Sequence, residues 1–403
     1  MRILHTSDWH LGKNLEGFTR MDEQEKFIDD FIHIVEENKV DLVIIAGDIY
    51  DNSNPPARAE KMFYNCIKKL SGNGERVVLI IAGNHDNPQR LVAANSLAYD
   101  DGILIIGTLN SIVPKGNFSN FKIIDSGVGY LELEIRKEKA VIITMPYPSE
   151  KRLDEIIYDD IENDEKRRKN YSDRIGEILN KLSKKYKDDT VNLMVSHIFV
   201  NGSEESDSER PIQLGGSLAV DTKALPSNAQ YIALGHLHKM QKVKNCDNAF
   251  YTGSPIPYSK SEIGYSKGCK IIDISPKSEA KIQDVYFNNY KPIEIWKCNG
   301  IEEAIEKCEE NKDRDMWVYL KIKTDKYITQ EEIKKLKEIK KDIVEIVPDI
   351  ESKDNEEEFE DIKEKSMKEL FEEFYVNERG VEPTGELLDL FLSIAQKEEE
   401  DEA

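Results

Sequence analysis

The stretches that decide the fold are HTSDWHLGK at residues 5–13, AGDIYD at 46–51 and AGNHD at 82–86. Each stretch contains or directly follows the end of an apolar run rich in β-branched residues, which is the composition of a strand buried on both faces. Two segments with helical spacing of apolar residues, 23–38 and 57–70, separate the three runs. The alternation of strand and helix predicts a parallel sheet with helices packed on it, as in layered α/β domains.

Two later apolar runs end in a similar way. Residues 191–195 lead into Ser-His at 196–197, and residues 231–234 lead into Gly-His-Leu-His at 235–238. Because α/β sheets bind their ligands beyond the carboxyl ends of the strands, we expect all five loops to converge on one patch. The candidate metal ligands in these loops are Asp8, His10, Asp48, Asn84, His197, His236 and His238.

Seven ligands are too many for one tetrahedral metal site, but they suit two cations that share a bridging carboxylate. Asp48 is the natural candidate for the bridge. Imidazole, carboxylate and amide ligands together fit Mn²⁺, Fe or Zn²⁺. Two such ions about 3.5–4 Å apart activate a water molecule and neutralise an in-line phosphoryl displacement. Hydrolysis of a phosphate ester is therefore the first reaction class that the sequence indicates.

His85 is the histidine of these loops that has no metal in this scheme. We assign it to the substrate side, where it would stabilise the reacting phosphate or protonate the leaving oxygen. Asp86 or Asp51 would hold its ring. The alternative is a structural histidine that is hydrogen-bonded below the site.

The remaining chain predicts three parts. Short β-like runs at 103–106, 121–124, 130–135 and 140–144 are expected to extend a second sheet with antiparallel strands, and a long charged helix is expected within 151–186. After Pro276 the pattern strand, helix, strand, helix, strand over 292–347 predicts a small α+β domain. The expected division is 1–275 for the core, 276–350 for the small domain and 351–403 for a C-terminal helical segment.

The net charge of −22 is concentrated in that C-terminal segment, which holds 20 acidic and 6 basic residues. Apolar residues recur at helical spacing over 359–375 and again over 384–395. Two short amphipathic helices need a surface to cover, either on the chain's own body or in the groove of a partner. A chain this acidic is not expected to bind nucleic acid strongly unaided.

Cysteine usage and hydropathy set the expected compartment. The five cysteines are odd in number and form no CxxC pair, which fits a reducing compartment. No stretch approaches the roughly 18 apolar residues of a membrane helix, and the N-terminus does not read as a signal peptide. We expect a cytoplasmic protein with no membrane segment.

In order and spacing, these motifs resemble those of the calcineurin-like metallophosphoesterases, with Asp-x-His, Gly-Asp, Gly-Asn-His-Asp, His and Gly-His-x-His met from end to end. More closely, the chain is similar to the nuclease subunits of bacterial SbcCD-type complexes. That similarity rests on HTSDWHLGK at 5–13, on YTGSP at 251–255 with Glu262 following, and on FYVNERGVEPTGELLDLF at 374–391.

The resemblance implies a layered β-sandwich core flanked by helices, a small capping domain and C-terminal helices. It implies an Mn²⁺-dependent 3′–5′ exonuclease and single-strand or hairpin endonuclease that processes DNA ends in repair and recombination. The implied partners are an SbcC-type ABC ATPase, bound through the C-terminal helices, and a second copy of the chain, bound through helices around 56–70 and 88–100.

The resemblance also divides the ligands between two ions, one held by Asp8, His10, Asp48 and His238 and the other by Asp48, Asn84, His197 and His236. Some relatives carry His at position 51, where this sequence has Asp.

Two other functions stay open: a stand-alone phosphoesterase for a small nucleotide, and a scaffold with an inactive site. The small domain and the tail helices favour the nuclease, because a small-substrate hydrolase has no evident use for them.

Overall fold

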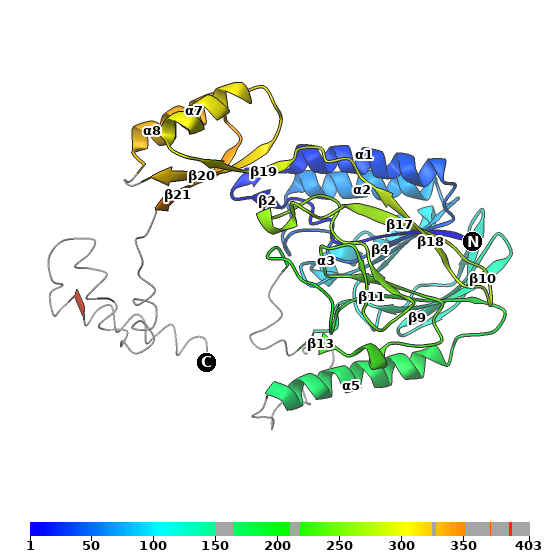
Figure 1. Ribbon diagram of the computed structural model, residues 1–403. Coiled ribbons are helices and arrows are strands. Elements are labelled where there is room, and N and C mark those ends of the chain that lie inside the picture. The colour runs from blue at the N-terminus through cyan, green and yellow to red at the C-terminus, as the bar shows by residue number, and fades with distance from the viewer. Residues whose placement is uncertain (150–163, 210–217, 325–327, 351–370, 372–386, 389–403) are drawn as a thin grey trace.

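The computed structural model describes most of the chain, namely residues 1–149, 164–209, 218–324 and 328–350 with Phe371, Leu387 and Leu388. Two β-sheets face each other, and helices cover their outer faces (Figure 1). One apolar cluster lies between the first sheet and the helices on its outer face, and a second lies between the two sheets. A third lies between the second sheet and the helix on its outer face. The predicted layered β-sandwich flanked by helices is confirmed.

The first sheet has six strands in the order β18-β17-β1-β4-β5-β6. Their bounds are β1 Arg2–Thr6, β4 Leu42–Ala46, β5 Val77–Ile81, β6 Ile103–Ile106, β17 Gly268–Asp273 and β18 Lys281–Tyr286. The strands β1, β4, β5 and β6 run parallel, and the hairpin β17–β18 pairs with β1 in antiparallel fashion. The parallel register brings the carboxyl ends of β1, β4 and β5 to the same edge.

Helices α1 (Met21–Glu37) and α2 (Ala57–Ser71) cover the outer face of this sheet (Figure 1). Their apolar residues recur every three or four positions, so each helix turns one apolar stripe toward the strands. Trp9 is fully buried among Phe27, Phe31 and Phe63, with edge-to-face ring contacts to all three. Two shorter helices, α3 (Pro88–Val92) and α4 (Asn95–Ala98), follow β5.

The second sheet has eight strands in the order β15-β16-β14-β11-β10-β9-β8-β7. Their bounds are β7 Gly116–Asn117, β8 Phe121–Gly127, β9 Tyr130–Ile135, β10 Glu138–Met145, β11 Val191–His197, β14 Tyr231–Gly235, β15 Gln241–Lys242 and β16 Ala249–Tyr251. Helix α5 (Asp164–Ser183) packs on its outer face through Tyr171, Ile175 and Leu179. A short two-stranded sheet, β12 (Phe199–Val200) with β13 (Ala219–Val220), lies beside it.

The prediction for residues 103–106 was wrong in its sheet and direction. Strand β6 pairs in parallel with β5 at the edge of the first sheet. The run from 140 was placed in the correct sheet, but β10 pairs in parallel with β11 as well as antiparallel with β9. A four-residue apolar run carries no information about which neighbour it pairs with, because both sheets offer the same buried environment.

The three-stranded sheet β19-β20-β21 is parallel and carries α7 (Ile301–Glu310) and α8 (Gln330–Ile339) on one face, around its own apolar cluster. Its strands are β19 Ile293–Cys298, β20 Trp317–Thr324 and β21 Ile343–Ile350. Trp317 connects this unit to the core, because its ring lies against Phe18 and its Nε1–H donates to Glu23 Oε1 at 2.8 Å. This contact fixes the small sheet beside α1.

The division of the chain into domains stays a prediction. Because β18 belongs to the first sheet, we propose that the core extends past Tyr286 instead of ending at residue 275. The expected tail helices at 359–375 and 384–395 lie almost wholly outside the described residues. Among the helices that are described, none combines the length and the apolar character needed to cross a bilayer.

Trp9→Ala is expected to lower the free energy of unfolding by about 3–5 kcal/mol, because it removes a fully buried ring from the cluster under α1 and α2. Urea denaturation followed by circular dichroism measures the change. Ile112→Ala, at a side chain that is 60% exposed, serves as the control and is expected to change it by less than about 0.5 kcal/mol. Equal effects of both substitutions would contradict the core described here.

Candidate metal centre

All seven predicted ligands lie at strand ends on one edge of the two facing sheets. Main-chain hydrogen bonds tie the first two loops together, with Asp8 N donating to Gly47 O and His10 N donating to Asp48 O, both at 3.0 Å. In the second sheet β11 ends at His197, beside the end of β14 at Gly235. The side chains that β1, β4, β5, β11 and β14 deliver therefore meet between the sheets.

The backbone at this edge is unusual. Asp8, His10, Asp48 and His236 all have positive φ angles, of 55°, 43°, 51° and 110°. Residues other than glycine seldom adopt this left-handed region, and each such residue stores backbone strain. Strain of this kind persists where the surrounding structure over-determines it, typically at a functional site.

Two glycines make room for the cluster. A Cβ atom on Gly47, which has a φ of 91°, would lie 2.4 Å from Nδ1 of His197. A Cβ atom on Gly235 would lie 1.9 Å from the carbonyl oxygen of Ala46. Only glycine therefore permits β4 and β14 to approach this closely above the ligands.

Three overlapping groups bring possible ligand atoms within 4.8 Å of one another: Asp8 with His10 and His238, Asp8 with Asp48 and His197, and His10 with Asp51 and His85. Asp48 Oδ2 lies 3.6 Å from Nε2 of His10 and 3.3 Å from Nε2 of His197, so this carboxylate stands between the two sides of the centre. The bridging role of Asp48 stays a prediction.

Asn84 completes the second side. Its Oδ1 lies 2.9 Å from Nε2 of His197 and 3.0 Å from Nδ1 of His236. The amide oxygen thus faces the same space as two imidazole nitrogens.

Burial sets the electrostatics of the cluster. Burial raises the pKa of Asp8 to about 6, although the neighbouring histidines lower it. Burial would also raise the pKa of Asp48, but the charge and hydrogen bond of His197 hold that pKa well below its ordinary value. The reciprocal effect raises the pKa of His197 to about 9 against the opposing effect of its burial. Burial lowers the pKa of His236 to about 3, so its ring is neutral and able to bind a cation.

The donor set fits two divalent cations. Nε2 of His10 and Nε2 of His238 lie 3.0 Å apart, and Nδ1 of His10 has no hydrogen-bond partner among the described residues. Imidazole nitrogens that converge on buried carboxylates and an amide oxygen are the ligands that Mn²⁺, Fe and Zn²⁺ share. Such a concentration of buried carboxylates would be costly without cations to neutralise it.

His85 lies beside the ligands. Its ring meets that of His10 edge-to-face at 4.6 Å, and its Nδ1 lies 2.6 Å from the main-chain oxygen of Asp51. The Asp51 carboxylate lies 3.2 Å from Nζ of Lys13. The Asp86 carboxylate accepts from the main-chain N–H groups of Gly83, Ile49 and Tyr50. We therefore propose that Asp86 braces the two loops, whereas the Asp51 carbonyl orients His85.

Three side chains near the site escaped prediction from the sequence. The Tyr147 ring is stacked near His236 at 6.4 Å, and Lys13 approaches Asp51. Gln24 on α1 donates to the main-chain oxygen of His10 at 2.9 Å. Lys13 ends the stretch at 5–13, but the sequence gives no sign that it would approach Asp51. Tyr147 and Gln24 lie outside the quoted motifs, and their contacts join segments that lie on different elements.

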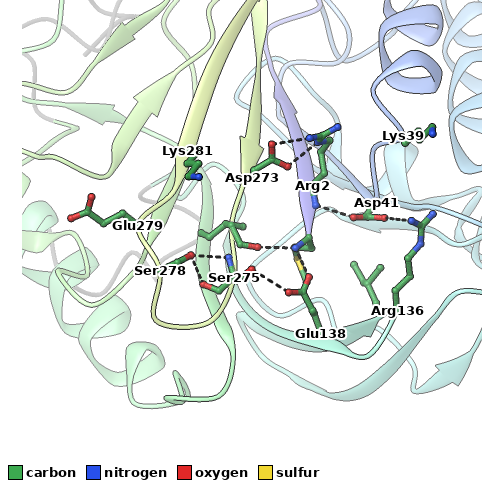
Figure 2. Close-up of a pocket in the computed structure, with 13 residues that line it drawn as sticks. Arg2, Lys39, Asp41, Arg136, Glu138, Asp273, Ser275, Ser278, Glu279 and Lys281 are labelled. Atoms are coloured by element: carbon green, nitrogen blue, oxygen red, sulfur yellow. Dashed lines mark hydrogen bonds and ion pairs between the residues drawn. The ribbon is translucent and has the colours of Figure 1, made fainter.

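The pocket in Figure 2 is a different feature, at the opposite end of the first sheet where β1 and β4 begin. Its charged side chains are largely paired with one another, as in Arg2 with Asp273 and Arg136 with Asp41. The convergent ligands are therefore at the other end of the strands from this pocket.

The calcineurin-like phosphoesterase family model matches residues 1–240, which contain every predicted ligand. A second model, described as the type 5 capsule protein repressor C-terminal domain and named SbcD_C, matches residues 289–379. The SbcD protein of the nuclease SbcCD from Bacillus subtilis (strain 168) is 38% identical over 409 residues, which covers the whole of both chains. The chain belongs to the SbcD family of calcineurin-like phosphoesterases.

Among solved structures, a dimetal phosphatase from Danio rerio is similar to this SbcD family member at 12% sequence identity. The match covers 70% of this chain and 98% of the phosphatase, with a TM-score of 0.38. Membership of the calcineurin-like phosphoesterases implies divalent metal ions at the centre described above.

Adding Mn²⁺ to chelator-treated protein is expected to raise its thermal unfolding midpoint, since a ligand at 100 times its dissociation constant stabilises the folded state by about 2.7 kcal/mol. Asp48→Asn should abolish most of this shift, because it removes the carboxylate between the two sides. Asp247→Asn, at a fully exposed position, is the matched control and should keep the shift. An unchanged shift in Asp48→Asn would rule out Asp48 as a shared ligand.

Proposed function

We propose that this chain is a divalent-metal-dependent DNA nuclease, with 3′–5′ exonuclease activity and single-strand or hairpin endonuclease activity. The observation that carries the proposal is that seven candidate ligand side chains from five strand ends lie close together, in a chain whose full length matches a nuclease subunit. We further propose Mn²⁺ as the metal and the two ligand sets given by the resemblance, with Asp48 shared between them.

When bound, the metal ions supply Lewis acidity that lowers the pKa of a water molecule and offsets the charge of the reacting phosphate. The protein orients the candidate ligand side chains before any ion binds. Backbone N–H groups fix the carboxylates, since His85 N donates to Asp48 Oδ1 and His236 N donates to Asp8 Oδ1, both at 2.9 Å. Because these donors are built into the loops, the carboxylates keep their direction when a phosphodiester arrives.

His85 is the proposed catalytic residue on the substrate side. A carbonyl oxygen can only accept a hydrogen bond, so the contact with Asp51 O requires that the proton sit on Nδ1 of His85. This contact directs the opposite ring nitrogen, Nε2, to the proton exchange with the leaving oxygen. An imidazolium at that position would also stabilise the negative charge of the reacting phosphate.

The proposed partner is an SbcC-type ATPase, since the relative's name describes it as one subunit of a complex. The acidic segment 351–403 is the part of the chain that we assign to this contact, and it holds most of the negative charge. The charge that remains on residues 1–350 is small, so DNA is not repelled strongly. It is also not attracted strongly, and we infer that tight DNA binding requires metal ions, a second copy of the chain or the ATPase.

The purified chain with Mn²⁺ is expected to degrade a blunt DNA duplex and to open a DNA hairpin, and the ATPase should stimulate both reactions. Gel analysis of end-labelled DNA measures the products, beside hydrolysis of bis-p-nitrophenyl phosphate. Asp48→Asn is the inactive control. Cleavage of the small ester alone, with no effect of the ATPase, would favour a stand-alone phosphoesterase and contradict the proposal.

His85→Gln is expected to bind Mn²⁺ as the wild type does while cleavage of DNA falls about 10²–10⁴-fold, the range for loss of a general acid. Metal content is measured by titration calorimetry and cleavage on the same preparation. His33→Gln, at an exposed histidine of α1, should leave both unchanged. If metal content falls together with activity, His85 is a ligand instead.

A further inference from the structure

A buried polar network lies behind His238, on the side of the ring away from the other ligands. Nδ1 of His238 lies 2.5 Å from Oγ of Ser208 and 3.4 Å from Oε1 of Glu262. The Ser208 hydroxyl also contacts Oε1 of Glu262. Ser208 belongs to the loop that follows β12, whereas Glu262 lies in a short 3₁₀ turn before β17.

Glu262 is fully buried and is held from several directions. Nζ of Lys267 contacts its Oε2, Ser254 Oγ donates to the same oxygen at 3.2 Å, and Tyr258 N donates to Oε1 at 3.2 Å. Lys267 is itself buried, and it donates to the main-chain oxygen of His238 at 2.9 Å. A buried ammonium requires a negative partner, so Glu262 is present as the carboxylate.

Gly253 lets this network approach the histidine. Its φ is 76°, and a Cβ atom there would lie 2.5 Å from the main-chain oxygen of His238. Main-chain N–H of Ser254 donates to that same oxygen at 3.2 Å. The main chain of His238 is further held by Glu209, whose Oε1 accepts from His238 N at 2.7 Å. Backbone and ring are thus braced together.

The direction of the hydrogen bonds decides the tautomer of His238. A carboxylate can only accept, so the Ser208 hydroxyl donates its one proton to Glu262. The Ser206 hydroxyl lies 2.9 Å from Oγ of Ser208 and donates to Glu209 at 2.6 Å, so its oxygen is a second possible acceptor for the Ser208 proton. The buried carboxylate of Glu262 is the stronger acceptor because it is charged, and it therefore takes that proton. Oγ of Ser208 must then accept from Nδ1 of His238, which requires the proton on Nδ1. If the Ser208 hydroxyl donated to Nδ1 of His238 instead, a lone pair on its Oγ would face a lone pair on Oε1 of Glu262.

We propose that Glu262 is a positioning residue which, through Ser208, holds His238 in its Nδ1–H tautomer and turns the bare Nε2 into the metal centre. That nitrogen lies 3.0 Å from Nε2 of His10. The chain of contacts from Lys267 to Glu262, Ser208 and His238 is the arrangement by which a carboxylate orients a metal-binding imidazole. The proposal rests on the proposed function in one respect, that His238 binds a metal ion.

The direct test is the tautomer of His238 in metal-free protein labelled with ¹⁵N-histidine. Long-range ¹H–¹⁵N correlation spectra distinguish a protonated from a bare ring nitrogen, and His238→Gln identifies the signal. We expect Nδ1 protonated and Nε2 bare in the wild type. A wild-type spectrum with the proton on Nε2 would overturn the proposal, whether or not any variant folds.

Two variants test the chain of contacts with Mn²⁺ alone as the probe. Glu262→Gln can donate to Ser208 through its amide and so reverse the hydrogen bonds, and we expect it to lose the Nδ1–H preference and about 10–100-fold in Mn²⁺ affinity. Ser208→Ala leaves Glu262 as the remaining acceptor at 3.4 Å, so the tautomer should persist and the affinity should fall only several-fold.

Glu132→Gln is the matched control, because Glu132 is also buried and paired with a lysine, Lys187, but lies on β9. It should leave the His238 spectrum and Mn²⁺ affinity unchanged. If Glu262→Gln behaves like this control, the proposal is wrong. Should Glu262→Gln not fold, wild-type Mn²⁺ affinity in Ser208→Ala would count against it. None of these measurements uses DNA, so a wild type that binds Mn²⁺ without cutting DNA would contradict the proposed nuclease alone.

Discussion

The structure depends on one constraint, the burial of the carboxylates of Asp8 and Asp48 among histidines between two sheets. Burial raises the pKa of Asp8, whereas the neighbouring histidines, His197 foremost, hold the pKa of Asp48 low against the same effect of burial. The layers of the fold serve this cluster, because apolar strands exclude water and their shared edge aligns the ligands. The strained backbone at Asp8 and Asp48 and the glycine at 47 follow from the need to bring charged loops this close.

Much of the core and of the site was predictable from the sequence. Continuous apolar runs with helical segments between them identify parallel strands, and the position of Asp8, Asp48 and Asn84 directly after such runs places them at one edge. The structure brings all seven predicted side chains together, while their division between two metal ions stays a prediction. The local signal is strong here because each candidate ligand lies at, or within a few residues of, the end of a strand.

What escaped prediction depends on contacts between distant parts of the chain. Strand β18 has mostly exposed residues and shows no apolar pattern, so only its pairing with β17 reveals it. Ser208 and Glu262 are 54 positions apart, and no spacing rule joins them. The edge strand β6 shows the same limit, because burial on both faces does not specify which neighbour a strand selects. The uneven distribution of acidic charge, in contrast, is read directly from the sequence, since most of the net charge falls beyond residue 350.

The central claim is that one buried carboxylate, Asp48, is shared by two metal ions. Anomalous diffraction from a crystal grown with Mn²⁺ measures this directly, since each bound ion gives its own peak. We predict two peaks, one contacted by Asp8, His10, Asp48 and His238 and the other by Asp48, Asn84, His197 and His236. A single peak, or two peaks of which only one touches Asp48, would contradict the claim.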